Sequence, residues 1–452
     1  MGVVIPQPSG GVKYPLPKVT IALIVANVIA YLVTTVENGL LSISNYWLLK
    51  GAFIPILILN PYQWYRFITS MFLHAGLFHI FFNMLYLYYF GKAVEMVLGG
   101  RRYLLLYFAS GILADLFHMA FIPIEGPASA VVPAIGASGA ISGILGSYLV
   151  LFPNSKISVC FFYFFFPVCF AWNAAGYLVF WFVTQVVEGY LGHSLGIAVF
   201  AHIGGFLGGL ALLPILLDRD RHRLVRALVG GRGYLYHVYA GNRGLGKLSK
   251  LVLALAIISI IAGSAYSAFS AKGVIEGVRV LNFRVKYGPS YAGAFKPKYF
   301  DEEPVTIRII NGRVDLLSSI SADSVRIVFN RLRALGFLYG KAKGGTIFVN
   351  KLLTAKVLGY SLRVNLNMEA TYDEEGYLIK AKGIMTTDVL TCLGFNCYIS
   401  GSGTFSFVIY PMYGGGGKLE GTITTLSLLS SVISLLALDN IIRRSDELSI
   451  YT

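Results

Sequence analysis

The sequence predicts an all-α polytopic membrane bundle with an appended α+β or mostly-β domain. Of the 452 residues, 56% are hydrophobic and only 13% are charged, and the mean hydropathy is +0.67. Soluble domains carry about 25% charged residues, so this composition argues against a purely soluble protein. It also excludes a disordered chain. Within residues 270–418, alternating and turn-rich patterns replace the long apolar stretches.

Seven apolar stretches are predicted to cross the membrane, because a bilayer core needs about 20 mostly apolar residues per helix. They are residues 19–36, 79–98, 103–122, 138–152, 174–191, 197–217 and 251–269. The connection over residues 37–78 is too apolar and aromatic for a solvated loop. We expect it to lie at the membrane interface.

The net charge of +15 is interpreted as a sign of topology, and no nucleic-acid partner is expected. Arg101, Arg102, Lys156 and the basic linker at residues 218–250 fall on one side if the spans alternate. Lys and Arg are enriched in cytoplasmic loops. The N-terminus is therefore expected in the cytoplasm, without a cleavable signal peptide, and the protein in the plasma membrane.

Residues 270–418 are then predicted to form an extracytoplasmic domain. Residues 305–310 and 404–409 alternate as strands do, and Asn311-Gly312 marks a turn between such runs. One helix is expected near residues 322–335.

The four cysteines form two pairs in the sequence. Cys392 and Cys397 are candidates for a disulfide if their domain faces an oxidising compartment. Cys160 and Cys169 lie in an aromatic stretch and are expected to pack as small apolar side chains.

The C-terminal region, residues 419–452, is apolar again over residues 422–438. Two alternatives are open for it. It forms an eighth span that returns to cytoplasmic arginines, or an amphipathic helix packed on the external domain. A stripe of Thr and Ser hydroxyls can bond back to carbonyls of the same helix.

The motif Gly136-Ala137-Ser138-Gly139 opens the fourth apolar stretch. A serine at a helix N-terminus lies beside unpaired N–H groups and the positive end of the dipole, which can stabilise an oxyanion. Its hydroxyl still needs a base to become a nucleophile. Taken alone, such a motif more often marks a small-residue packing face.

His202 in the sixth stretch can supply that base. Two overlapping Gly-x-x-x-Gly pairs follow it, Gly204 with Gly208 and Gly205 with Gly209, and such pairs permit close helix contact. Packing against the small residues of the fourth stretch would bring His202 within hydrogen-bond reach of Ser138. The combination predicts nucleophilic catalysis.

Three further polar residues, His74, His79 and Asn83, lie near the start of the second stretch. Polar side chains at membrane depth are costly and are functional-site candidates. A metal site of His74, His79 and His202 lacks a carboxylate or cysteine to complete it. Neither a metal nor another cofactor is expected.

Together, these residues resemble the rhomboid intramembrane serine proteases over about residues 15–217. The matching stretches are residues 64–74, 79–84, 90–95, 136–139 and 201–202 with the glycines that follow. The resemblance implies a six-helix protease core at residues 1–217, with one or two extra transmembrane helices after it.

The resemblance also implies roles for site residues. Ser138 is similar to the family's nucleophile and His202 to its general base, a dyad without a carboxylate. His79 and Asn83 resemble the pair that stabilises the oxyanion, and Gly136 the glycine before the nucleophile.

Other residues near the site are expected to be structural. They are His74, Gly205, Gly209 and the pair Tyr65 and Arg66, which resembles an aromatic–arginine pair that orders the first loop. Glu95 is expected to pair with Arg101 or Arg102. Four residues after the nucleophile the family often carries an aromatic ring that stacks on the histidine, but this sequence has Ser142. Either another ring supports His202 or the imidazole is held less firmly.

The sequence therefore predicts a serine endopeptidase that cleaves transmembrane segments of other proteins within the bilayer. The resemblance also implies that substrates enter laterally, past residues 174–191. One alternative is a non-catalytic escort that binds membrane helices. A transporter or receptor is another, but it leaves the motifs unexplained. The sequence contains no indication of an oligomeric state.

Overall fold

The computed structural model describes residues 2–6, 16–163, 166–192, 198–230, 244–287, 301–318, 320, 322–393, 396–411 and 416–450. The chain divides into two compact units. The helical unit comprises Met1–Val274 and Gly421–Thr452, and the sheet unit comprises Ile275–Glu420.

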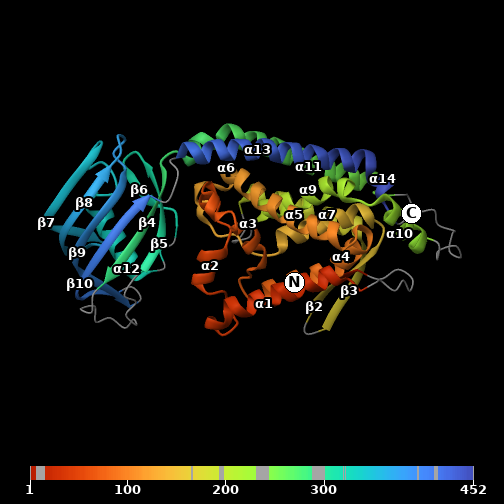
Figure 1. Cartoon of the computed structure of the whole chain (residues 1–452), viewed down its shortest axis with the longest axis horizontal. Helices are drawn as coiled ribbons and strands as arrows, with labels where there is room; N and C mark the ends of the chain where they lie inside the picture. Colours follow the sequence, from red (N-terminus) through yellow and green to blue (C-terminus); the bar gives the residue numbers. More distant parts are fainter. Residues whose placement is uncertain are drawn as a thin grey trace. The chain divides into compact units, whose positions relative to one another are not determined.

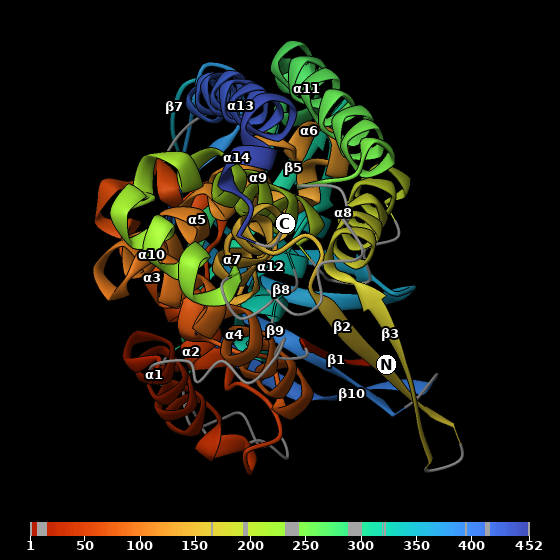
Figure 2. The same ribbon diagram turned by 90° about the vertical axis from the view of Figure 1, so that its right-hand side faces the viewer.

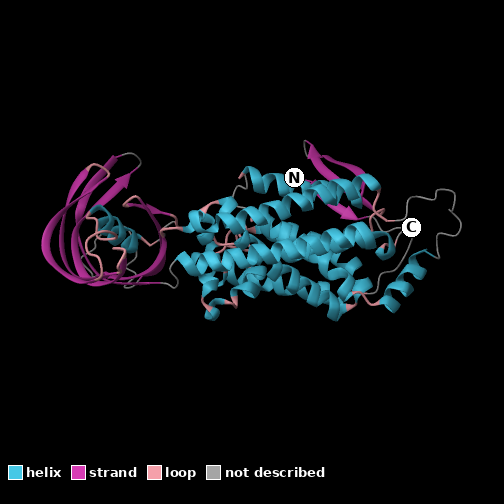
Figure 3. Cartoon of the chain, turned by 90° about the horizontal axis from the view of Figure 1, so that it is seen from above, coloured by secondary structure: helices cyan, strands magenta, loops and turns pink. Residues whose placement is uncertain are grey.

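Eight helices of at least 14 residues form the bundle of the helical unit in the described chain (Figures 1 and 3). They are α1 (Lys18–Thr35), α4 (Leu77–Leu98), α5 (Gly100–Ala120), α7 (Ser138–Leu151), α8 (Ala174–Leu191), α9 (Val199–Leu216), α11 (Lys247–Ile275) and α13 (Gly416–Asp439). Helix α7 lies in the middle, where α4, α5, α8 and α9 contact it (Figure 2).

Six of the described helices are long and apolar enough to cross a membrane, namely α1, α5, α8, α9, α11 and α13. Together with the shorter apolar helix α7, they fit the helical core of a polytopic membrane protein by length and composition. The basic linker after α9 contains a further helix, α10 (Arg219–Gly230). Residues 231–243 of this linker lie outside the described residues.

The C-terminal helix α13 belongs to the helical unit. The Ser427 hydroxyl donates to the Ala120 carbonyl of α5 at 3.1 Å, and the Ser431 and Ser264 hydroxyls lie 2.6 Å apart between α13 and α11. The stripe of hydroxyls thus joins α13 to two other helices. The alternative of an amphipathic helix packed on the external domain is therefore wrong.

The Glu95 carboxylate of α4 caps the start of α1. It accepts the N–H groups of Val19 and Thr20 at 3.0 and 2.8 Å and the Thr20 hydroxyl at 2.7 Å. A carboxylate at a helix N-terminus satisfies unpaired donors and favours the positive end of the dipole. The predicted pairing of Glu95 with Arg101 or Arg102 is wrong. Arg102 forms an ion pair with the Asp218 carboxylate instead, at 2.9 Å.

A small antiparallel sheet, absent from the sequence-based prediction, precedes α8. Its strands are β1 (Gly2–Pro6), β2 (Lys156–Tyr163) and β3 (Phe166–Asn173), in that spatial order. Cys160 on β2 lies opposite Cys169 on β3 in the strand register, and Cys169 is disulfide-bonded. The prediction that Cys169 packs as a small apolar side chain is therefore wrong.

The sheet unit is a seven-stranded antiparallel half-barrel that curves around one helix, α12 (Asp323–Ala334) (Figure 3). Its spatial order is β6-β5-β4-β10-β9-β8-β7. The strands are β4 (Val278–Tyr287), β5 (Asp301–Ile310), β6 (Arg313–Leu316), β7 (Gly345–Val357), β8 (Tyr360–Tyr372), β9 (Leu378–Leu393) and β10 (Asn396–Pro411). The strands predicted near residues 305–310 and 404–409 and the helix predicted near residues 322–335 are all present.

Local sequence explains much of this unit. Asn311 and Gly312 between β5 and β6 have φ values of 49° and 76°, which a tight hairpin turn with two left-handed residues requires. On β8, every second residue from Leu362 to Tyr372 is buried. This alternation fits a strand with one face on an apolar core.

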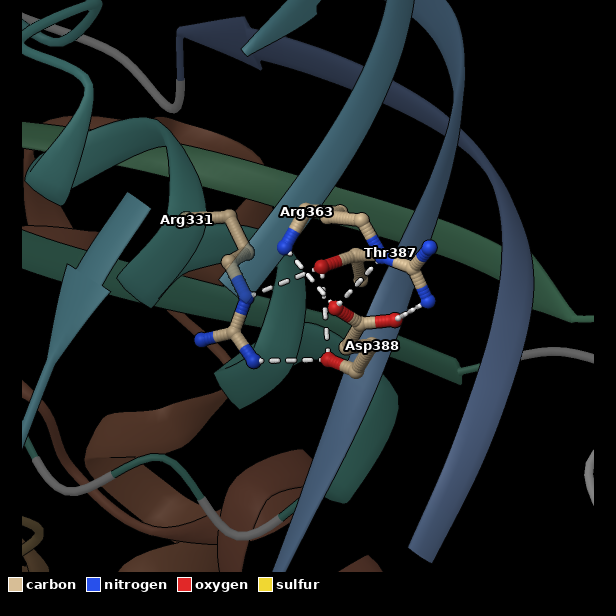
Figure 4. A network of polar contacts seen from close by, with 4 residues as sticks. All are labelled: Arg331, Arg363, Thr387 and Asp388. Carbon is tan, nitrogen blue, oxygen red and sulfur yellow. Dashed lines mark hydrogen bonds and ion pairs between the residues drawn. The ribbon is translucent and has the colours of Figure 1, made fainter. Parts of the chain in front are cut away.

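Arg331 of α12 is buried, and two of its nitrogens bind β9 (Figure 4). Its Nε donates to the Thr387 hydroxyl at 3.1 Å and its Nη2 to the Asp388 carbonyl at 3.0 Å. Burial alone would raise the pKa of the Asp388 carboxyl, but hydrogen bonds from the Arg363 backbone and side chain lower it below its ordinary value. These donors compensate for the cost of burying charge.

Candidate active site

Ser138 is the first residue of α7, and Gly136 shapes the loop before it. Gly136 has a φ of +126°, a conformation that side chains disfavour, and its N–H donates to the Ser70 carbonyl at 2.9 Å. A β-carbon at Gly136 would lie 2.8 Å from His79 Nε2 and 3.5 Å from Ser138 Oγ. The missing side chain therefore leaves a space that both groups border.

The glycines of α9 allow backbone contact with two helices. A β-carbon at Gly205 would lie 2.0 Å from the Gly139 carbonyl oxygen of α7. A β-carbon at Gly209 would lie 1.9 Å from the Gly143 carbonyl oxygen of the same helix. The other pair, Gly204 and Gly208, packs against Phe117 and Leu113 of α5. Gly204 and Gly208 thus allow α5 to approach α9 closely, whereas Gly205 and Gly209 set the distance between α9 and α7.

This contact brings Ser138 and His202 together. His202 Nε2 lies 2.8 Å from Ser138 Oγ, within ordinary hydrogen-bond distance. Ser142 is buried, and its hydroxyl donates to the Ser138 carbonyl at 2.7 Å. The geometry favours support of His202 by another ring. The Trp181 ring of α8 lies 6.2 Å from the imidazole, centroid to centroid, at 34°.

The other imidazole nitrogen, His202 Nδ1, lies 2.7 Å from Gln185 Oε1 on α8. Sequence reasoning did not single out Gln185 or its neighbour Glu188, whose carboxylate lies 3.3 Å from Gln185 Nε2. A signal was present, because Gln185 is a strongly polar residue within an apolar helix. The rule that identified His79 and Asn83 applies equally to it.

His79 and Asn83 lie one turn apart on α4. The Ala75 backbone N–H donates to His79 Nδ1 at 3.2 Å, so a neutral imidazole carries its proton on Nε2, the nitrogen that faces Gly136 and the space beside Ser138. Asn83 is buried and donates one amide hydrogen to the His79 carbonyl at 2.8 Å. Its second amide hydrogen leaves it a further donor.

His74 is fully buried, and its ring packs edge-on against His79 with centroids 5.0 Å apart. It makes no contact with Ser138 or His202 that would give it a chemical role. In the described part of the chain, no three His, Cys, Asp or Glu side chains are grouped as metal ligands would be.

Tyr65 and Arg66 fix the connection between α1 and α4, which contains α2 (Asn45–Gly51) and α3 (Arg66–Thr69). The buried Arg66 guanidinium donates to the Ala52 carbonyl at 2.7 Å and lies 5.4 Å from the centre of the Tyr65 ring. The Tyr65 hydroxyl donates to the Lys50 carbonyl at 2.9 Å. These bonds order an otherwise irregular loop.

Cys392 and Cys397 lie far from this site in sequence, at the turn between β9 and β10. Cys397 is disulfide-bonded, and Cys392 is its direct neighbour across the hairpin register. The side chain of Cys392 lies outside the described residues.

Comparison with known proteins adds a family assignment. Residues 61–219 match the family described as "Rhomboid domain". This range includes the residues of the site from Tyr65 to Gly209, but not Lys50 and Ala52, whose carbonyls bind Tyr65 and Arg66. It excludes α1, α11, α13 and the sheet unit.

Three curated relatives are similar to parts of this chain. "RHOMBOID-like protein 1" of Arabidopsis thaliana is 33% identical over 204 residues, which is 44% of this chain and 46% of the relative. "Rhomboid-type serine protease 2" of Emericella nidulans is 34% identical over 156 residues, 34% of this chain and 27% of the relative. "Inactive RHOMBOID-like protein 8" of Arabidopsis thaliana is 32% identical over 165 residues, 35% of this chain and 40% of the relative. The chain spans less than half the length of each.

Proposed function

The chain belongs to the rhomboid family through residues 61–219, and from this premise we propose that it is an intramembrane serine endopeptidase. The observation that carries the proposal is the 2.8 Å separation between Ser138 Oγ and His202 Nε2 at the start of α7. A nucleophile within hydrogen-bond reach of a base is the arrangement that acyl transfer needs.

In the proposed reaction, His202 Nε2 takes the Ser138 proton as the hydroxyl oxygen attacks a peptide carbonyl. The resulting oxyanion accepts hydrogen bonds from His79 Nε2–H, from the Asn83 amide and from backbone N–H groups at the start of α7. His202 then returns the proton to the leaving amine. Water attacks the acyl-enzyme in the same way to release the second product.

The substrates proposed are transmembrane segments of other membrane proteins. A helical segment hides its carbonyls in i to i−4 bonds, so cleavage requires it to unwind locally. Helix-destabilising residues near the cleavage site would lower that cost. Helix α8 borders the site, because its side chains face His202. We therefore propose that the substrate enters laterally past α8 when this helix moves.

A second candidate function is the binding and escort of membrane helices without cleavage, since one relative is named inactive. The proximity of Ser138 to His202 favours the protease, because an escort requires neither group.

A fluorophosphonate probe distinguishes these functions. We expect it to label the purified full-length protein, and expect Ser138→Ala and His202→Ala to lose labelling. Ser142→Ala is the matched control, because its hydroxyl lies one turn further along α7 and binds a carbonyl. Persistent labelling of Ser138→Ala would mean that a different nucleophile reacts, and an unlabelled wild type would favour the escort function.

We further propose that α13 is an eighth span, that the N-terminus is cytoplasmic and that the sheet unit lies outside the plasma membrane. Residues Lys356 on β7 and Arg223 on α10 are both exposed and suit a test. A membrane-impermeant maleimide should label Lys356→Cys in intact cells and should label Arg223→Cys only after lysis. The reverse pattern would invert the topology.

A further inference from the structure

The imidazole of His202 is held on both of its nitrogens. Nε2 lies 2.8 Å from Ser138 Oγ, and Nδ1 lies 2.7 Å from Gln185 Oε1 of α8. Gln185 is itself buried, with 8% of its surface exposed. Building on the proposed function, we infer that Gln185, oriented by Glu188, is a positioning residue that selects the reactive tautomer of His202.

The first step concerns the direction in which the Gln185 amide points. The Glu188 carboxylate lies 3.3 Å from Gln185 Nε2, three residues along the same helix. An ionised carboxylate accepts hydrogen bonds and donates none. The amide group must therefore turn its NH₂ toward Glu188, which leaves its oxygen toward His202. The partners on both sides agree with this orientation of the amide.

The second step concerns the proton on His202. An amide oxygen can only accept, so the hydrogen bond with Gln185 requires a proton on His202 Nδ1. In the neutral ring Nε2 then holds the lone pair, and the Ser138 hydroxyl can donate to it. This is the tautomer that a general base for Ser138 needs. In the opposite tautomer, Nε2 would carry the proton and could not accept one from the Ser138 hydroxyl. The lone pair of Nδ1 would then face a lone pair of Gln185 Oε1.

The third step concerns the choice of an amide. In serine proteases with a triad, a buried carboxylate orients the histidine and stabilises the imidazolium. Burying an ionised carboxylate in apolar surroundings costs far more than burying a neutral amide. Gln185 supplies the orienting acceptor without a second buried charge, while Glu188 remains exposed on α8. The charge is thus kept at the surface of the helix, two hydrogen bonds away from the imidazole ring.

The proton balance is simple in this arrangement. One proton passes from Ser138 Oγ to His202 Nε2 as the new C–O bond forms, and passes on to the leaving amine as the C–N bond breaks. The proton on Nδ1 stays bonded to Gln185 Oε1 throughout. The other titratable groups near this imidazole are His79 of α4 and Glu188, which acts through the amide.

Three substitutions on α8 test the inference in the full-length protein, with the rate of fluorophosphonate labelling measured as a function of pH. Gln185→Met keeps the approximate volume but removes the acceptor for an imidazole that becomes charged, and should slow labelling on the order of 10-fold to 100-fold. Gln185→Glu restores an acceptor and should regain most of the rate. Its carboxylate favours the imidazolium, so the acid limb of the pH profile should move to higher pH. Thr184→Val is the matched control, because the Thr184 hydroxyl binds a carbonyl of its own helix.

Glu188 is tested by two variants that separate its charge from its capacity to accept. Glu188→Gln keeps an oxygen acceptor for the Gln185 amide and should label almost as fast as wild type. In Glu188→Leu the Gln185 amide can rotate and exchange its oxygen and NH₂ positions. This variant should slow labelling by about 3-fold to 10-fold, which corresponds to the net free energy of one hydrogen bond. Equal rates for both variants would remove Glu188 from the arrangement.

A second measurement reads the tautomer directly. Solid-state ¹⁵N spectra of histidine-labelled protein in bilayers, with His202→Gln subtracted, should show a protonated Nδ1 in wild type and a mixture of tautomers in Gln185→Met. The inference is overturned if Gln185→Met labels at the wild-type rate with an unchanged pH profile, or if Gln185→Glu slows labelling as much as Gln185→Met does. Loss of labelling in the wild type would instead count against the proposed protease itself.

Discussion

Helix α9 contacts its two neighbours at the site in different ways. Against α7, backbone lies on backbone, because Gly205 and Gly209 leave no room for a side chain beside the Gly139 and Gly143 carbonyls. Against α8, long side chains fill the interface. Gln185 reaches His202 Nδ1, and the Trp181 ring lies beside both His202 and Phe206.

The difference separates two geometric requirements of the proposed reaction. The distance between Ser138 and His202 depends on how closely α7 and α9 approach, and a contact without side chains cannot adjust when that distance changes. The orientation of the imidazole depends on groups from α8 with several rotatable bonds. Substitutions on the α7 side should therefore act almost in an all-or-none manner, whereas those on the α8 side should have graded effects.

The largest effect is expected from Gly209→Ala. The new β-carbon would meet the Gly143 carbonyl at 1.9 Å, so α9 must move away from α7 and carry His202 with it. A displacement of about 1 Å at a reacting pair can lower a rate by about 100-fold. Labelling of Ser138 by the fluorophosphonate should fall by at least this amount, and the thermal midpoint of unfolding should drop.

Gly421→Ala is the control for the glycine substitution itself. A β-carbon at Gly421 of α13 meets nothing within 4 Å, and alanine is favoured over glycine in a helix by about 1 kcal/mol. This variant should label normally and melt no lower than wild type. If Gly209→Ala labels as fast as Gly421→Ala, the tight contact does not set the distance within the dyad, and the comparison fails.

A graded effect is expected from Trp181→Leu on the α8 side. Contacts between aromatic rings contribute about 0.5–1.5 kcal/mol beyond the area that they bury, which corresponds to about 2-fold to 10-fold in rate. Labelling should slow within this range, and Trp181→Phe should recover part of the loss. Phe180→Leu is the matched control, because this neighbouring ring is 55% exposed. A loss of 100-fold in Trp181→Leu would show that α8 is as rigid a support as α7.

Sequence alone predicted the contact with α7 more completely than the contact with α8. Small residues at fixed helical spacing indicate which helix faces can touch, and so the sequence predicts that Ser138, His202 and Gly205 lie together. The family assignment was confirmed by the match over residues 61–219. Gln185 was missed because its relation to His202 depends on how two helices rotate against each other, which spacing within one helix does not determine.

The same limit explains the errors elsewhere in the chain. Glu95 caps α1 from 75 residues or more along the chain, whereas charge and proximity in the sequence favour the nearby Arg101 or Arg102. The β2–β3 hairpin lies in a continuous aromatic run, where apolar residues on both faces hide the period of two. In the sheet unit the alternation at residues 305–310 and 404–409 predicts strands, and both are present in β5 and β10, but the order of the strands depends on pairing between distant segments. Local periodicity in the sequence thus predicts strands and helices, but it does not predict which distant segments pair.

The smallest effect is expected from Tyr190→Phe, where α8 meets the additional helix α11. The Tyr190 hydroxyl donates to the Ser259 carbonyl at 2.6 Å, and side-chain hydrogen bonds between membrane helices contribute about 0.6 kcal/mol on average. Removing this bond should free α8 without disturbing the α7–α9 contact. Cleavage of a transmembrane reporter should then rise by about 3-fold, while labelling by the small fluorophosphonate stays unchanged.

Tyr266→Phe on α11, where the ring is exposed, is the matched control and should change neither the cleavage rate nor the labelling rate. If Tyr190→Phe alters labelling as much as cleavage, then α11 constrains the dyad itself, because α8 would transmit the change directly to His202.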